Sequence, residues 1–242
     1  STQHPSEFDE GMRLFDADLD GDLDLVRNNS FLTRFHRNDG GTFDAGTIVD
    51  GNENGDTYGY GLNVCDVNGD GFEDVVLPSN DRTTTVGVPH LLVNVNGTLV
   101  PSAIEAGTAV ANDLLACADL DGSGTPDVVS RWTVGGTSSF GLPIRLVQMR
   151  TLRNREAATD TITLRIVDAE GRRNQQGRAV RLRPLAAPGR TLLRTVESGS
   201  GYLSQNGYDL LVAAPWPGDY EVEVRYAGGW VRATARPGDV LT

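Results

Sequence analysis

The sequence predicts an all-β protein, with a partial β-propeller of three blades over residues 1–150 and a small β-sandwich or barrel over residues 151–242. An acidic pattern recurs about every fifty residues, which is long enough for one four-stranded propeller blade per repeat. The chain has 29 glycines and 11 prolines among short runs of Val, Thr and Leu, a composition typical of strands and tight turns. Beyond residue 150, segments such as "VEVRY" alternate with a period of two, which favours strands over helices.

Three acidic loops carry the repeated pattern. They are "DADLDGDLD" at 16–24 (loop one), "DVNGDGFED" at 66–74 (loop two) and "DLDGSGTPD" at 119–127 (loop three). A glycine follows the fifth position each time, and apolar segments typical of buried strands lie on both sides of each loop. Each loop is therefore predicted to join two strands.

Oxygen-bearing side chains on alternate residues of these loops predict calcium sites. This spacing lets a tightly curled backbone surround one hard cation, and the glycine permits the sharp turn. The seventh position varies freely, so we expect its backbone carbonyl to bind. Mg²⁺ is a poorer match because it prefers near-ideal octahedral sites that retain several waters. We predict about three Ca²⁺ ions, held by Asp16, Asp18, Asp20, Asp22, Asp24, Asp66, Asn68, Asp70, Phe72, Asp74, Asp119, Asp121, Ser123, Thr125 and Asp127.

Two other interpretations of the loops are weaker. An EF-hand needs Glu at position 12 and two flanking helices, whereas position 12 here is Arg27, Leu77 or Ser130 and the flanks are strand-like. A single acidic surface turn could bind nothing at all. Three copies in register, each closed by Asp at position 9, favour a metal site over that alternative.

Charge is concentrated in the first part of the chain. Residues 1–150 hold 23 acidic and 8 basic side chains, residues 151–242 hold 10 and 13, and the net charge is −12. Three bound Ca²⁺ ions would reduce this to −6, and without them the loops should repel one another. An acidic surface excludes nucleic acid as the expected partner. The sequence contains no run of eighteen apolar residues, so it predicts no membrane-spanning helix.

The two cysteines, Cys65 and Cys117, allow two interpretations. A disulfide fits an exported protein, but two buried free thiols are the interpretation that the sequence favours. Their offsets from loops two and three differ by one residue, which aims the two side chains at opposite faces of their strands. Neither belongs to a zinc-type cluster.

The loops and their flanks resemble a known family. "FDADLDGDLDLV", "CDVNGDGFEDVVLPS" and "ADLDGSGTPDVVS" are similar to FG-GAP repeats of the VCBS-type variant, found in integrin α-subunit propellers and many secreted bacterial proteins. "FHRNDGGTFDAG" at 35–46 resembles the hairpin that follows the calcium loop in such repeats, and "LLVNVNGTLV" at 91–100 is a weaker copy. The resemblance covers about residues 7–150 and implies calcium-loaded blades in a secreted, extracellular or periplasmic protein.

The C-terminal part resembles another family. "GRRNQQGRAVRLRP", "SGSGYLSQNGYDLLVA" and "VEVRYAGGWVRATARPGDVLT" together are similar to an ASPIC/UnbV domain, which commonly follows FG-GAP repeats, as in cartilage acidic protein. Two family segments are altered here, to "VAAPWPG" and "YAGG". The central loop offers Tyr202, Ser204, Gln205 and Asn206 as polar ligand-binding groups, or it simply sets a sheet register.

No catalytic constellation is found in the sequence. The three histidines are scattered, and HExxH, GxSxG, Walker and GxGxxG patterns are missing. We therefore expect a non-enzymatic, exported, calcium-stabilised binding or scaffold module that acts in adhesion or as an accessory subunit of a surface complex, with a protein or glycan as its partner. The alternative is a polysaccharide hydrolase or lyase built on the propeller, for which Asp209, Glu221 and Glu223 are the candidate acids and bases.

Overall fold

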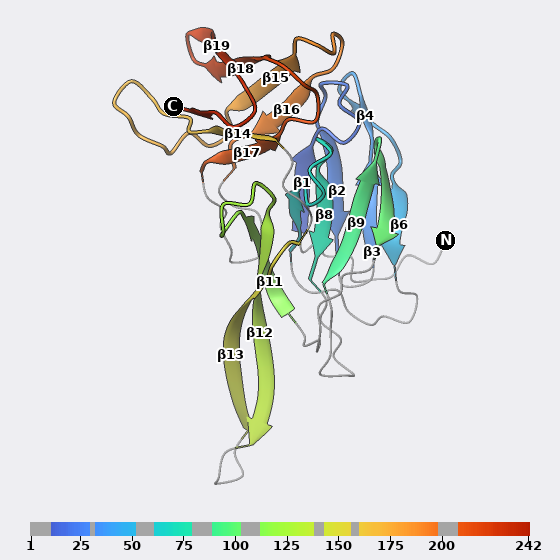
Figure 1. Ribbon diagram of the computed structural model, residues 1–242. Helices are drawn as coiled ribbons and strands as arrows, with labels where there is room; N and C mark the ends of the chain where they lie inside the picture. Colours follow the sequence, from blue (N-terminus) through green and yellow to red (C-terminus); the bar gives the residue numbers. More distant parts are fainter. Residues whose placement is uncertain are drawn as a thin grey trace.

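The computed structural model of the chain describes residues 11–29, 32–51, 61–78, 89–102, 112–137, 143–155, 160–197 and 208–242. Every regular element in these ranges is a β-strand (Figure 1), so the all-β prediction is confirmed. The described strands form several sheets and no closed propeller. The number of blades stays a prediction.

Three antiparallel sheets hold the acidic loops. The first repeat sheet has the order β1-β2-β3-β6, the second β7-β8-β9-β10 and the third β11-β12-β13. A small hairpin, β4-β5, follows β3. The bounds are β1 Gly11–Phe15, β2 Asp24–Asn28, β3 Leu32–His36, β4 Asn38–Asp39, β5 Thr42–Phe43, β6 Thr47–Gly51, β7 Asn63–Cys65, β8 Asp74–Leu77, β9 His90–Val95, β10 Thr98–Ser102, β11 Asn112–Ala118, β12 Asp127–Thr137 and β13 Pro143–Leu152.

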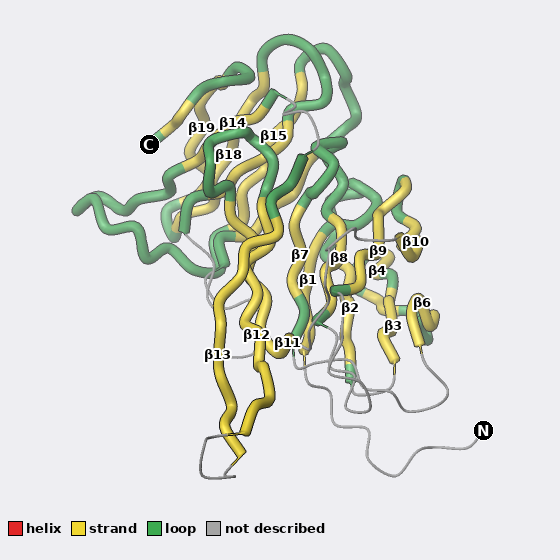
Figure 2. Tube along the Cα trace, turned by 60° about the horizontal axis from the view of Figure 1, so that its bottom comes forward, coloured by secondary structure: helices red, strands yellow, loops and turns green. Residues whose placement is uncertain are grey.

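Each acidic loop joins the first two strands of its sheet, as predicted. Loop one follows β1, loop two follows β7 and loop three follows β11. Two strands, rather than two helices, therefore flank every loop, which agrees with the rejection of an EF-hand. Figure 2 shows that β12 and β13 form a long hairpin that reaches well beyond the other two repeat sheets.

The repeat sheets pack face to face. One apolar cluster joins the first and second sheets and includes Val26 and Val75, both fully buried. A second cluster joins the second and third sheets and includes Val76 and Val128. Side chains alternate along a strand, so Val75 and Val76 point to opposite neighbours. Strand β8 of the second repeat sheet is therefore buried on both faces, as its apolar "DVVL" sequence indicates.

Cys65 and Cys117 form a disulfide between the second and third repeat sheets, with 6.4 Å between their Cα atoms. The free-thiol interpretation that the sequence favoured is therefore wrong. Cys65 lies on the face of β7 that packs toward the third sheet, and Cys117 on the face of β11 that packs toward the second. Opposite orientations on their own strands bring the two side chains together, because neighbouring sheets present opposite faces to each other.

Removal of this disulfide is expected to destabilise the protein. The bond closes a separation of 52 residues, and loss of such a cross-link costs roughly 2–4 kcal/mol. The double variant Cys65→Ser/Cys117→Ser should show this loss in urea denaturation. Wild-type protein under reducing conditions is the control and should lose the same amount. A variant as stable as the oxidised wild type would contradict the expectation.

Two further sheets make up the C-terminal part. Their orders are β17-β14-β20 and β16-β15-β18-β19. Residues from both sheets, including Ile162, Leu182 and Tyr220, share one buried core, as expected for a sandwich. The bounds are β14 Thr161–Leu164, β15 Ala179–Pro184, β16 Leu192–Thr195, β17 Leu210–Ala213, β18 Tyr220–Tyr226, β19 Gly229–Ala235 and β20 Val240–Leu241.

One detail of this part differs from the antiparallel sandwich that the alternation predicts. The short strand β20 pairs in parallel with β14. Alternation within a strand reports which face is buried and carries no information about strand direction. The direction is set by the chain path after β19, which returns the C-terminal residues to the edge of β14.

The C-terminal sheets cover the loop end of the repeat sheets (Figure 1). Leu19 of loop one and Phe72 of loop two are buried in the same core as the C-terminal strands. The two predicted parts therefore share apolar contacts. Strand β13 ends at Leu152, two residues beyond the predicted boundary at 150, and the division into domains stays a prediction.

Candidate metal centre

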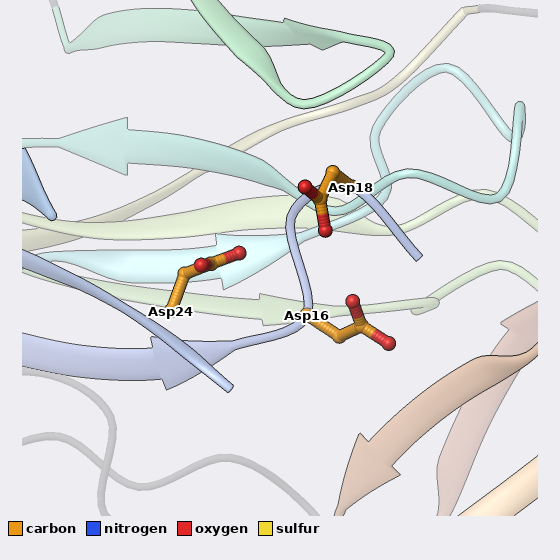
Figure 3. Close-up of side chains that lie close together, drawn as sticks. All are labelled: Asp16, Asp18 and Asp24. Carbon is orange, nitrogen blue, oxygen red and sulfur yellow. The ribbon is translucent and has the colours of Figure 1, made fainter. Parts of the chain in front are cut away.

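Loop one brings three carboxylates together. Oxygens of Asp16, Asp18 and Asp24 lie within 4.8 Å of one another, close enough to bind one cation. Asp16 and Asp18 project from the loop and Asp24 from the start of β2, so the loop curls back on its own second strand (Figure 3). The tight curl uses Gly21, whose φ is +96°.

Two oxygens of this cluster are buried without a hydrogen-bond donor in the described part of the chain. They are Oδ1 of Asp16 and Oδ1 of Asp18. Oδ2 of Asp16 accepts a 3.2 Å hydrogen bond from the Gly21 N–H, and Oδ2 of Asp18 pairs with Arg37. A buried acceptor without a partner is costly unless another positive group satisfies it. The donor set therefore fits a hard divalent cation, which prefers carboxylate oxygens.

Burial shifts the acid–base behaviour of the loops. It raises the pKa of Asp16 to about 7, that of Asp66 to about 6 and that of Asp74 to about 7, above the ordinary 3.8. Nearby Arg194 acts against burial and lowers the pKa of Asp16 and Asp66. Since these folded-state values are raised, the metal-free protein loses stability from these groups as pH rises from about 4 to 7.

Loop one also contains a residue in an unusual backbone conformation. Leu19, at position 4, has φ +61°, whereas Gly69 and Gly122 hold the equivalent positions with φ +71° and +75°. A left-handed conformation favours glycine. Leucine is accommodated because its side chain is only 5% exposed and packs into the C-terminal core. Position 4 of loop one thus serves the contact with the C-terminal sheets.

Asp20 and Asp22 of loop one lie outside the three-carboxylate cluster. Asp20 is exposed and accepts a hydrogen bond from the Asp22 N–H, with 2.9 Å between Asp22 N and Asp20 Oδ1. Asp22 Oδ2 accepts from Gly40 N, at 2.9 Å. Both carboxylates therefore stabilise turns.

The last aspartate of each loop has a second, structural task. One oxygen of Asp24 accepts from Ala17 N at 2.9 Å, and the other accepts from Asn38 N at 2.8 Å. Asp74 binds Val67 N and Asn94 N, and Asp127 binds Leu120 N and Asn154 N, in the same way. Position 9 therefore ties the start of its loop to the third strand or hairpin of its sheet.

In loops two and three the described residues form no comparable group of three acids. Asp66 accepts hydrogen bonds from the N–H groups of Gly69, Asp70 and Gly71. Asp119 accepts from the equivalent backbone groups of loop three. These bonds occupy the carboxylates of the first position, and positions 3 of loop two and 5 of loop three are the neutral Asn68 and Ser123.

The remaining predicted ligands serve local contacts. Asp70 Oδ1 accepts from Phe72 N at 2.9 Å, and Asp121 pairs with Arg153 at 2.6 Å. The Phe72 side chain belongs to the C-terminal core, and the buried Thr125 contacts Ser123. Among the predicted sites, loop one alone brings three carboxylates together within the described residues.

An arginine from the C-terminal part lies between loops one and two. Arg194 is 5% exposed and donates from Nη2 to the carbonyl oxygen of Gly71 at 2.7 Å. Its Nε lies 3.5 Å from Glu73 Oε1. Sequence reasoning missed this residue, because nothing in "RTLLRTVES" distinguishes a buried arginine from an exposed one.

A cavity of about 370 Å³ lies between the repeat sheets and the C-terminal sheets. Its wall includes the disulfide and the ion pairs Arg13–Glu197 and Arg194–Glu73. These charges compensate one another. The Nε of Arg13 is the one guanidinium atom of this wall that is buried without a partner among the described residues.

The carboxylates of the enzyme alternative are paired with arginines. Asp209 binds Arg165, and both Glu221 and Glu223 bind Arg183. Burial alone would raise the pKa of Glu223, but its hydrogen bonds to arginines outweigh burial and lower that pKa. A general acid needs the opposite shift. The polar groups Tyr202, Ser204, Gln205 and Asn206 lie outside the described residues.

Comparison with known families supports the predicted FG-GAP-like repeat for the second and third acidic loops. A family model described as an FG-GAP-like repeat matches residues 66–130, which run from loop two through loop three. Comparison with curated proteins gives no match. The resemblance of the C-terminal part to ASPIC/UnbV domains stays a prediction.

Proposed function

We propose that the chain is an exported, non-enzymatic binding or scaffold module of the β-propeller type, whose loop one binds a structural Ca²⁺. The observation that carries this proposal is the pair of buried oxygens on Asp16 and Asp18, beside Asp24, that have no hydrogen-bond partner among the described residues. The FG-GAP-like match supports the module type, and the disulfide is typical of proteins in oxidising compartments.

The finer parts of the proposal concern architecture and partners. The three repeat sheets act as blades, and the C-terminal sandwich is an ASPIC/UnbV-like part that covers their loop end. Adhesion, or a place as accessory subunit in a surface complex, follows from this class of module, with a protein or glycan as the ligand. Among the described residues no helix is long and apolar enough to cross a membrane.

Calcium is proposed over magnesium because of the ligands available. The curled loop offers carboxylates at several angles, which suits the variable geometry of Ca²⁺. Loops two and three are expected to bind more weakly, since backbone N–H groups already occupy their first aspartates. Isothermal titration distinguishes one strong site from the three sites that the sequence predicts.

Calcium is expected to raise the melting temperature of the metal-free protein. With a dissociation constant of about 10⁻⁴ M, about 2 mM Ca²⁺ stabilises the folded state by about 2 kcal/mol. For a chain of this size the shift is about 4–8 °C. Thermal melts in EDTA and in calcium measure it, and Mg²⁺ at the same concentration should produce a smaller shift.

Asp16→Asn tests the ligand assignment. Asparagine keeps an acceptor for the Gly21 N–H but loses the charge, so the calcium-dependent part of the melting shift should largely disappear. Asp39→Asn, an exposed acid on β4, is the matched control and should keep the full shift. Equal shifts in the two variants would remove loop one as the site.

A further inference from the structure

Each repeat sheet has two faces that differ in what they contact. We call the face that is turned toward the next sheet in chain order the following face, and the opposite face the preceding face. The first and third sheets are the ends of the series, so their outer faces are identified by equivalent residues. Val26 and Val76 occupy the same place on the following faces of the first and second sheets, two residues after the last loop aspartate, and both are 0% exposed. Their equivalent on the third sheet is Val129.

In the described ranges, no sheet packs on the following face of the third repeat sheet. Val129 is half-buried, in contrast to the fully buried Val26 and Val76. Leu120, at position 2 of loop three, is 49% exposed, whereas Ala17 at position 2 of loop one is 0% exposed. Met149 lies opposite Arg131 on the same face and is 65% exposed.

Nor does any sheet of the described part of the chain pack on the preceding face of the first repeat sheet. Leu14 and Cys117 are equivalent, because each pairs with the residue that follows the last aspartate of its loop. Leu14 is 46% exposed, whereas Cys117 is 8% exposed. Phe43 corresponds to Leu99 in the next repeat, and their exposed fractions are 45% and 5%. Apolar side chains here lack the neighbour that covers their equivalents.

Hydrogen bonds between adjacent repeats follow one rule. Asn94 donates from Nδ2 to the carbonyl oxygen of Ala17 in loop one at 2.8 Å, and Asn154 donates from Nδ2 to that of Val67 in loop two at 2.6 Å. Each of the two also donates within its own repeat, to the carbonyl oxygens of Glu73 and Pro126. The equivalent Asn38 makes this bond within its repeat, to Leu23, and among the described residues it makes no bond to another repeat. In the described part of the chain, the carbonyl oxygen of Leu120 in loop three receives no such bond. The Nδ2 of Asn38 in the first repeat and this carbonyl in the third repeat therefore lack the contact that their equivalents make.

An arginine makes a second contact between the first and second repeats. Arg37 pairs with Asp18 and donates from Nη2 to the carbonyl oxygen of Gly97, in the hairpin turn of the next repeat, at 2.7 Å. A Cβ on Gly97 would lie 2.6 Å from the Cβ of Asp18, so glycine is required for this close approach. Arg153 pairs with Asp121 as Arg37 pairs with Asp18, and its side chain is 57% exposed.

The turn that would receive Arg153 is present at the other end of the chain. Gly41 corresponds to Gly97 and has nearly the same backbone, with φ +91° against +86°. Of the residues that the structure describes, none lies within 4 Å of the position that a Cβ on Gly41 would take. The first repeat therefore has the turn, and no loop among the described residues packs against it.

We propose that two copies of this chain associate head to tail, with the following face of the third repeat sheet of one copy on the preceding face of the first repeat sheet of the other. Asn38 would then donate to the Leu120 carbonyl of the second copy, and Arg153 to its Gly41 carbonyl. Each copy supplies three repeat sheets, so two such contacts close a ring of six sheets. Propellers typically have four to eight blades, and a ring of six lies within this range. The proposal stands on the two faces and not on calcium.

The mass of the protein in solution tests the proposal. Sedimentation velocity over a concentration series should show a species of twice the 25.9 kDa chain mass. Leu14→Asp places a charge on the preceding face and Met149→Asp on the following face, and each variant alone should be monomeric. Leu185→Asp, on an exposed leucine of the C-terminal part, is the control and should stay dimeric.

A mixture of the two variants identifies the contact as head to tail. Each variant alone has a charged face in both contacts of the ring, whereas the mixture can form one contact from two unaltered faces. The mixture should therefore contain dimers that neither variant forms alone. Circular dichroism melts confirm folding, and Phe43→Asp replaces Leu14→Asp if the latter fails to fold. A monomeric wild type, or a dimer lost in one variant only, would overturn the proposal.

Discussion

Asp74→Ala is expected to reduce the free energy of unfolding by roughly 2–6 kcal/mol, since it leaves two buried N–H groups without an acceptor. Asp74 is fully buried, and its oxygens accept from Val67 N at 2.9 Å and Asn94 N at 2.7 Å. These bonds connect the start of loop two, strand β8 and strand β9. Urea denaturation in EDTA measures the loss without a contribution from bound metal.

Asp70→Ala is the matched control in the same loop. Asp70 is exposed and its hydrogen bonds lie within loop two, so its removal should cost less than about 1 kcal/mol. The loss of unfolding free energy in Asp74→Asn should lie between those of Asp74→Ala and Asp70→Ala, because an amide keeps one acceptor oxygen for one of the two N–H groups. If Asp74→Ala cost no more than Asp70→Ala, position 9 would not have the structural task assigned to it.

Arg194→Met is expected to destabilise the protein by about 3–5 kcal/mol, the usual cost of breaking a buried ion pair. Methionine fills a similar volume, so the loss reports charge and hydrogen bonds more than packing. The change removes the donor to Gly71 and leaves Glu73 without its arginine. The pKa of Asp16 and of Asp66 should also rise further, because Arg194 lowers both.

Arg232→Met is the control for Arg194→Met. Arg232 also pairs with a buried carboxylate, Glu223, but its side chain is 67% exposed, and Glu223 keeps Arg183. The expected cost is about 0–1 kcal/mol. The double variant Arg194→Met/Glu73→Gln should recover part of the loss, since no uncompensated charge remains. Additive losses in the double variant would contradict the ion-pair assignment.

Much of the repeat could be predicted from the sequence because its determinants are local. The glycine after the fifth loop position, the alternate oxygen-bearing side chains and the apolar flanks act within ten residues. Strand pairs on either side of each loop therefore follow from pattern alone. The acidic cluster of loop one follows in part, since Asp16, Asp18 and Asp24 were all predicted ligands.

The tasks of individual loop residues could not be predicted. Asn38, Asn94 and Asn154 bind the last loop aspartates from residues 14 to 27 positions away in the chain, and only the fold brings them there. The "RNDG", "VNVNG" and "RNR" segments contain the asparagines but lack any signal of their shared role. The disulfide is a similar case. The offsets of Cys65 and Cys117 from their loops differ by one residue, and this fits a disulfide only because neighbouring sheets turn opposite faces toward each other.

The sequence alone determined that this protein consists of strands, that acidic turns recur three times and that the first part is strongly anionic, because strand periodicity, turn chemistry and charge are properties of short segments. The tertiary structure decided which carboxylates meet, which cysteines bond, where Arg194 lies and which sheet faces stay uncovered. These features depend on contacts between residues far apart in the chain, and a pattern of near neighbours carries no record of such contacts.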